Sequence, residues 1–213
     1  MASRANDEPI QPAHAAALTG AEQRTAARYT PLIRAAKITG VSGEFLCVVS
    51  DISATGVSVR LFHQLPRDHT LRLEMPTGDG LPIERVWEKD GRAGFRFATE
   101  IDLTKILDGH GQWPKRPIRL NLDMPAKLSG LTGRFEATIK NISLQGAQIE
   151  CASRLAIDQR LRMSNAVLPE IVTKVRWRKG NVYGLIFDNT FHFAELARMV
   201  ALAQGIAADR QIA

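Results

Sequence analysis

The stretch SDISATGVSV, residues 50–59, interrupts two apolar, β-branched runs with an acid, a hydroxyl and a glycine. Asp51, Ser53 and Gly56 stand here in the pattern D-x-S-x-x-G. Asp and Ser side chains hydrogen-bond nearby backbone groups, and glycine tolerates positive φ, so this pattern is typical of a turn. A single copy therefore predicts two strands joined by a turn.

The pattern occurs a second time in the same chain. The stretch KNISLQGAQI repeats it as Asn141, Ser143 and Gly146, each 90 residues after its counterpart. The same ungapped shift aligns many identical residues of 36–97 with those of 126–187. A register of this length indicates that a whole domain occurs twice. The 213 residues are therefore divided into two domains of about 100 residues each.

Six short apolar runs, separated by Gly, Pro, Asp and Thr, fill the first half and recur in the second. In the first half they span 31–40, 43–53, 56–62, 70–75, 81–87 and 91–98. Six closely spaced strands predict a small antiparallel barrel or sandwich. The alternation ends at 99–107, which predicts a short helix, and at 189–207, which predicts a longer one with Asn189 or Thr190 as its N-cap.

Composition excludes several classes of protein. No apolar run approaches the roughly 18 residues of a membrane helix, and two cysteines without metal-site spacing predict neither a disulfide framework nor a zinc site. A reducing cytoplasm fits this usage. The net charge of +6 is uneven, with 13 basic against 14 acidic residues in 1–112 and 15 against 8 in 113–213. An anionic partner is therefore expected at the second half.

The sequence contains no recognisable catalytic or metal-binding set. The five histidines are scattered, and no H-E-x-x-H, G-x-S-x-G or Walker pattern occurs. Cys47 lies within an apolar run, which predicts a buried structural thiol. We therefore expect a binding protein rather than an enzyme, with no metal and no cofactor.

Two arginines precede the first repeat. Arg24 and Arg28 form R-x-x-x-R, and Arg28 lies 23 residues ahead of Asp51. Alone, this pair of arginines predicts only a solvent-exposed face of a helix or loop. Together with D-x-S-x-x-G on a six-strand pattern that ends in a short helix, it makes residues 22–107 resemble the PilZ domain, and residues 113–190 share the resemblance with defects.

The resemblance implies an all-β protein of two tandem six-stranded antiparallel barrels, each followed by a helix, the C-terminal helix being the longer. Its implied ligand is the bacterial second messenger cyclic di-GMP. The domain boundaries that we expect are a disordered tail at 1–21, a first barrel at 22–108, a linker at 109–114, and a second barrel with its helix at 115–213.

The residue types suit such a ligand. The planar guanidinium groups of Arg24 and Arg28 can clamp a phosphate, pair with guanine O6 and N7, or stack on a purine. The Asp51 carboxylate can accept from the guanine N1 and N2 donors, and Ser53 can add a neutral hydrogen bond. Gly56 can adopt a conformation that other residues avoid and lets a flat base approach the strand.

The second half departs from this pattern. Its arginine segment aligns only after a one-residue shift, and lysine, a point charge rather than a fork, replaces the first arginine. The candidate second site comprises Lys115, Arg116, Arg119, Asn141, Ser143 and Gly146. It either binds cyclic di-GMP or is a degenerate copy used for packing or for contacting a partner.

A basic cluster surrounds Trp177 in the second half. It consists of Lys174, Arg176, Arg178 and Lys179. The pattern is typical of an edge hairpin with charged outer positions, and a nucleic-acid surface would look similar. Because Trp87 occupies the equivalent place in the less basic half, core or cap packing is favoured for both tryptophans.

Three functional hypotheses follow. The leading one is a cyclic di-GMP receptor that binds through the first barrel and signals by contact with an unidentified protein. The second is a nucleic-acid-binding or protein-binding double barrel without a cyclic dinucleotide ligand, and the third is a scaffold whose motif loops are only turns. No membrane partner is expected, nucleic acid is disfavoured, and homodimer formation is left open.

Overall fold

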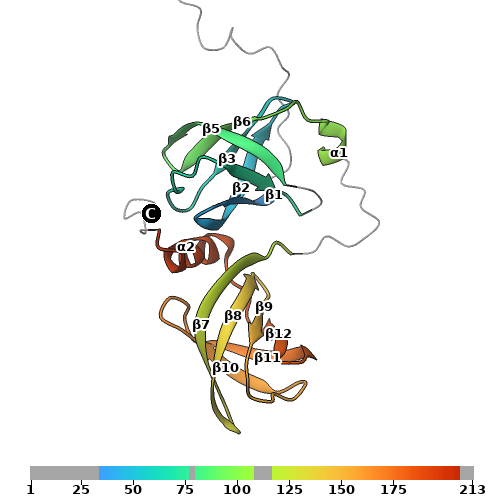
Figure 1. Cartoon of the computed structure of the whole chain (residues 1–213), viewed down its shortest axis with the longest axis vertical. Coiled ribbons are helices and arrows are strands. Elements are labelled where there is room, and N and C mark those ends of the chain that lie inside the picture. Colours follow the sequence, from blue (N-terminus) through green and yellow to red (C-terminus); the bar gives the residue numbers. More distant parts are fainter. Residues whose placement is uncertain (1–33, 77–79, 108–116, 207–213) are drawn as a thin grey trace, which may run out of the picture.

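The computed structural model of the chain describes residues 34–76, 80–107 and 117–206. Within them the chain forms two closed antiparallel barrels of six strands each (Figure 1). The all-β fold class and the tandem arrangement are therefore confirmed. The tail and linker expected at 1–21 and 109–114 lie outside the described residues.

The first barrel is built from six strands and followed by a short helix. These elements are β1 (Arg34–Gly40), β2 (Gly43–Ile52), β3 (Gly56–Arg60), β4 (Leu71–Glu74), β5 (Leu81–Lys89), β6 (Arg92–Phe97) and α1 (Leu103–Leu107). Their order around the barrel is β1-β2-β3-β6-β5-β4, and pairing of β1 with β4 closes it.

The second barrel repeats this order with six strands and a longer helix. Its elements are β7 (Leu120–Gly130), β8 (Gly133–Ser143), β9 (Gly146–Glu150), β10 (Arg160–Ser164), β11 (Ile171–Lys179), β12 (Val182–Phe187) and α2 (Phe193–Ala203). Pairing of β7 with β10 closes this barrel.

The strands form because their apolar residues alternate with polar ones. In β3, Val57 and Val59 are buried while Arg60 is exposed, and Ala147 and Ile149 are buried at the matching places of β9. Successive side chains of a strand point to opposite faces, so this alternation fills a barrel interior from one face. Burial of each large apolar side chain contributes about 1.5–3 kcal/mol.

Helix α2 begins later than the sequence predicts. Its N-cap is His192, which makes no capping hydrogen bond through its side chain, rather than Asn189 or Thr190. The backbone N–H of Phe191 donates to the carbonyl of Leu144 at 3.0 Å, which keeps the chain extended past the predicted caps. The predicted cap was therefore wrong because a tertiary hydrogen bond takes precedence over the local signal.

Helix α2 lies between the two barrels (Figure 1). Leu196 and Val200 belong to the apolar core of the second barrel, whereas Ala201 belongs to that of the first. The ring of Phe62, from the first barrel, meets the ring of Phe193 edge-on with centroids 5.6 Å apart. The two cores are thus joined through one helix.

Polar contacts complete the junction between the barrels. Gln204 Oε1 accepts from the Glu44 backbone N–H at 2.8 Å, and Gln204 Nε2 donates to the Glu44 carbonyl at 2.9 Å. The Glu44 carboxylate accepts from the backbone and side-chain amides of Asn121, each at 2.8 Å, and from Lys37 Nζ at 2.9 Å. Glu44 therefore binds both α2 and the start of β7.

Candidate functional site

The serine of each motif helps to build the turn that carries it. The Ser53 backbone N–H donates to the Gly56 carbonyl at 2.8 Å, and the Gly56 N–H donates to Ser53 Oγ at 3.1 Å. In the second barrel, Ser143 Oγ donates to the Gly146 carbonyl at 3.1 Å. The two turns thus share one architecture, in which the hydroxyl is already a structural group.

The motif glycines are required by close approach of a neighbouring strand. A Cβ atom on Gly56 would lie 2.7 Å from the Phe95 carbonyl oxygen, and one on Gly146 would collide with the Leu185 carbonyl. Neither Gly56 nor Gly146 is among the described glycines with positive φ. The expectation of an unusual backbone conformation was therefore wrong, and the motif glycine instead lets β3 and β9 lie against β6 and β12.

The acid and amide of the motifs follow a β-bulge near the end of their strands. Asp51 is half-buried opposite Ser58, just after an irregularity in the pairing of β2 with β3. Asn141 occupies the equivalent place opposite Gln148, and its Nδ2 donates to Gln148 Oε1 at 2.9 Å. The amide donor of Asn141 is therefore engaged within the second barrel.

Only one of the predicted arm residues is described. Those outside the described residues are Arg24, Arg28, Lys115 and Arg116. Arg119 lies exposed immediately before β7. Between Asn121 and Met124 the pairing of β7 with β8 shifts, with one additional residue on β7.

The structure brings three predicted residues of the second barrel into one pocket. Arg119, Ser143 and Gly146 line a pocket of about 180 Å³ on the outside of the barrel. Asn141 is not among the residues that line it. An arm arginine and the motif turn thus share a single concave surface.

The same pocket contains residues that sequence reasoning did not assign to a site. Arg176 and Trp177 of β11 line it, together with Gly184 of β12. The signal that could have found them is the spacing W-x-x-x-x-x-x-G, present in both repeats.

The repeated tryptophans lie on glycines at the barrel surface. A Cβ atom on Gly184 would collide with the indole of Trp177, and one on Gly94 would collide with that of Trp87. Trp177 and Trp87 are 39% and 45% exposed. The prediction of core or cap packing was therefore wrong, because each indole covers the outer face of a strand that has no side chain at that position.

The basic strand β11 is not an edge. It pairs with β10 on one side and β12 on the other within a closed barrel. Lys174 Nζ lies 3.4 Å from Asp158 Oδ1, and the Arg178 guanidinium lies 5.7 Å from the centre of the Tyr183 ring. The edge-hairpin interpretation was wrong because barrel closure pairs both sides of the strand.

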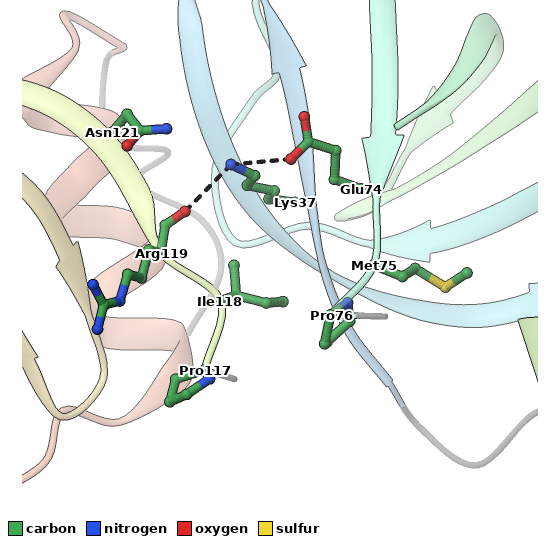
Figure 2. A pocket seen from close by; sticks show the side chains of 8 residues that line it. All are labelled: Lys37, Glu74, Met75, Pro76, Pro117, Ile118, Arg119 and Asn121. Atoms are coloured by element: carbon green, nitrogen blue, oxygen red, sulfur yellow. Dashed lines mark hydrogen bonds and ion pairs between the residues drawn. The ribbon is translucent and has the colours of Figure 1, made fainter. Parts of the chain in front are cut away.

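A second pocket, of about 470 Å³, lies at the junction of the barrels. It is lined by Lys37, Glu74, Met75, Pro76, Pro117, Ile118, Arg119 and Asn121 (Figure 2). Lys37 Nζ lies 3.1 Å from Glu74 Oε2 and donates to the Arg119 carbonyl at 3.3 Å. Figure 2 shows the Arg119 side chain extending away from Lys37. Pro117 and Arg119 line both pockets, so residues 117–119 separate them.

The charge of Lys37 is held in place by its partners. Burial by itself disfavours the ammonium, but hydrogen bonds to Glu44 and Glu74 outweigh it and raise the pKa of Lys37 above its ordinary value. The lysine is therefore a fixed cation at the junction.

Other chemistry is limited in the described part of the chain. Cys47 is fully buried, as predicted, and burial raises the pKa of its thiol. Among residues 34–76, 80–107 and 117–206, no three His, Cys, Asp or Glu side chains gather to hold a metal ion. None of the described helices is long and apolar enough to cross a membrane.

With the fold and the motif turns in place, comparison by sequence defines the class of protein. The model of the PilZ domain matches residues 22–108 and again residues 115–202, so the chain belongs to the PilZ family. No curated protein matches the chain by sequence.

Solved structures similar to this chain include proteins of several bacteria. PlzA of Borreliella burgdorferi, in complex with c-di-GMP, is 13% identical over 78% of this chain and 87% of its own, with a TM-score of 0.34. YcgR of Escherichia coli, in complex with c-di-GMP, is 8% identical over 81% and 84%, with a TM-score of 0.32. The MrkH–c-di-GMP complex of K. pneumonia is 13% identical over 79% and 85%, with a TM-score of 0.31.

Proposed function

We propose that this protein is a cyclic di-GMP receptor whose first barrel binds the dinucleotide and which signals by contact with another protein. The binding residues in this proposal are Arg24, Arg28, Asp51, Ser53 and Gly56. The arginines supply forked cations for phosphate and guanine, and Asp51 supplies an acceptor for the guanine N1 and N2 donors.

The pocket of the second barrel is the observation that carries the proposal. There Arg119, which precedes the first strand of its barrel, lines the same pocket as Ser143 and Gly146. Because Ser53 and Gly56 form the same kind of turn, we propose that Arg28 takes part in binding together with this turn of the first barrel. The repeat thus supports a site made by an arm and a turn together.

The junction supports signalling through a protein contact. Pro117 and Arg119 line both the pocket of the second barrel and the pocket between the barrels. Lys37 of the first barrel binds the Arg119 carbonyl at 3.3 Å. A ligand that moves this segment would therefore alter a surface shared by both barrels. We place the protein in the cytoplasm and among effectors rather than enzymes, with an unidentified protein as its partner.

Calorimetric titration of cyclic di-GMP into the full chain tests the proposal. Loss of one bidentate arginine contact costs about 1–3 kcal/mol, so Arg28→Ala should weaken binding roughly five- to a hundredfold. Arg119→Ala should weaken only binding at the second barrel and so reduce only the heat that this site contributes. Arg154→Ala, which removes an exposed arginine outside both motif turns, is the control. Absence of heat in the wild-type chain would overturn the proposal.

A nucleic-acid-binding function is the second candidate. It is favoured by β11, which exposes Arg176 and Lys179 beside the half-exposed Trp177. Such binding would weaken steeply as salt concentration rises, because cations on the protein displace counterions from phosphates. Affinity for a single-stranded oligonucleotide that falls with salt and is indifferent to cyclic di-GMP would favour this candidate.

A further inference from the structure

A β-bulge directs two neighbouring side chains of β11 to one surface. The pairing of β11 with β12 shifts between Val175 and Trp177, which leaves Arg176 as the additional residue. Bulges re-aim side chains and are frequent beside binding sites. The first barrel has the same irregularity, with Val86 as its additional residue. The two barrels therefore share the geometry and differ in the residue that it presents.

The pocket beside this bulge holds two arginines from different segments. Arg176 comes from β11 and Arg119 from the residues before β7, and both line the pocket next to the half-exposed face of Trp177. Its volume of about 180 Å³ lies below the roughly 300–1,000 Å³ of sites that enclose a whole drug-sized ligand. It therefore suits one planar base or one phosphate of a larger molecule.

The neighbouring cations of β11 are engaged elsewhere. Lys174 is paired with Asp158 at 3.4 Å. Arg178 donates from Nε to the Gly180 carbonyl at 2.9 Å and lies over an aromatic ring. Neither Lys174 nor Arg178 lines the pocket, whereas Arg176 does. Of the four cations in the basic cluster, only Arg176 therefore lines the pocket beside the motif turn.

The arms and the bulges of the two barrels differ in a complementary way. The first barrel has arginines at both arm positions, Arg24 and Arg28, and a valine at the bulge. The second barrel has Lys115 in place of the first arginine, Arg119 in place of the second, and Arg176 at the bulge. Lysine is a point charge and cannot replace the forked donors of arginine. Each barrel therefore has two guanidinium groups in these three positions.

We infer that Arg176 supplies the second guanidinium of a guanine-nucleotide site on the second barrel, in place of the missing arm arginine. This inference rests on the proposed function and extends it to the second barrel. Arg176 and Arg119 would together bind phosphate or the O6 and N7 edge of guanine from two sides, since a fork matches either group with two parallel hydrogen bonds.

The test is calorimetric titration of cyclic di-GMP into the full chain carrying Arg28→Ala, which weakens the first site. Adding Arg176→Val, the residue of the first barrel at this position, should reduce the remaining affinity roughly five- to a hundredfold. Arg176→Lys keeps the charge without the fork and should fall between the two. Lys179→Val removes the same charge from the same strand outside the pocket, and it should change the affinity less than about twofold.

The outcomes separate the inference from the proposed function. If the wild type gives no heat, the proposed function and the inference both fail. If the wild type binds but Arg28→Ala leaves no residual binding, or if Arg176→Val equals Lys179→Val, only the inference fails. Thermal unfolding of each variant, expected to be unchanged because Arg176 is exposed, excludes misfolding as the cause.

Discussion

Two glycines in equivalent hairpins provide a matched test of how α2 docks. Gly43 has φ of +131° and Gly133 has φ of +133°, so alanine would be strained to the same degree at both. A Cβ atom on Gly43 would collide with the Gln204 side chain, whereas one on Gly133 meets only Phe135 Cζ at 3.9 Å. The two substitutions therefore differ in one respect, the contact with α2.

The expected difference follows from the hydrogen bonds that the collision breaks. The common backbone strain costs about 1–3 kcal/mol in each variant. In Gly43→Ala the Gln204 amide must also leave its two bonds to the Glu44 backbone, made at 2.8 and 2.9 Å. At about 0.5–1.5 kcal/mol for each bond, Gly43→Ala should destabilise the chain by about 1–3 kcal/mol more than Gly133→Ala.

Urea unfolding of the full-length variants measures this difference, and Gln204→Ala closes the cycle. With Gln204 already truncated, the collision is absent, so the two glycine substitutions should cost the same. Equal costs of Gly43→Ala and Gly133→Ala in the wild-type background would refute the argument. A difference that persists in the Gln204→Ala background would refute it too, because its source would then lie outside this contact.

Three further outcomes are expected. Glu44→Ala should lower the free energy of unfolding by about 1–3 kcal/mol, since it removes the hydrogen bonds between the barrels, whereas the exposed Glu136 should tolerate alanine in the same urea titration. Burial lowers the pKa of His63 in the folded chain. The neutral imidazole should therefore stabilise the fold fully above about pH 6.5, the ordinary pKa of histidine, and this stabilisation should decline as the pH falls from there toward the lowered pKa. In His63→Phe the melting temperature should depend less on pH over this range. Gly146→Ala should cost about 1–3 kcal/mol, because its Cβ collides with the neighbouring backbone, and an unchanged melting temperature would contradict this.

The strands could be predicted from the sequence because their signals are local. Alternation in β3 and β9 fixes which residues face inward, and the 90-residue repeat identifies the second barrel from the first. The position of α2 could not be predicted in this way. Its apolar face, with Leu196 and Val200, would equally suit its own barrel alone, and nothing local indicates that Ala201 enters the core of the other barrel.

In the candidate site, too, some features follow from local sequence signals and others depend on tertiary contacts. The motif turns at Ser53 and Ser143 were predictable, because their hydrogen bonds join residues three apart. The role of Gly146 was not, since it depends on the Leu185 carbonyl of a strand nearly 40 residues away. Arg176 was counted only as one charge in a basic cluster, because its place in the pocket depends on a bulge that appears only once β11 is paired with β12.

The two repeats differ at a position that joins the two barrels. Glu44, whose carboxylate accepts from the backbone and side-chain amides of Asn121, has Arg134 as its counterpart 90 residues on. Because arginine has no carboxylate, the contacts that Glu44 accepts from Asn121 and Lys37 have no counterpart at Arg134. Glu44 binds Asn121, two residues after Arg119, and Lys37 donates to the Arg119 carbonyl at 3.3 Å. A ligand that binds the Arg119 side chain at the second barrel, as proposed above, would act on a backbone segment that the first barrel already contacts. Binding at one barrel would then be coupled through this segment to the fit between the two barrels.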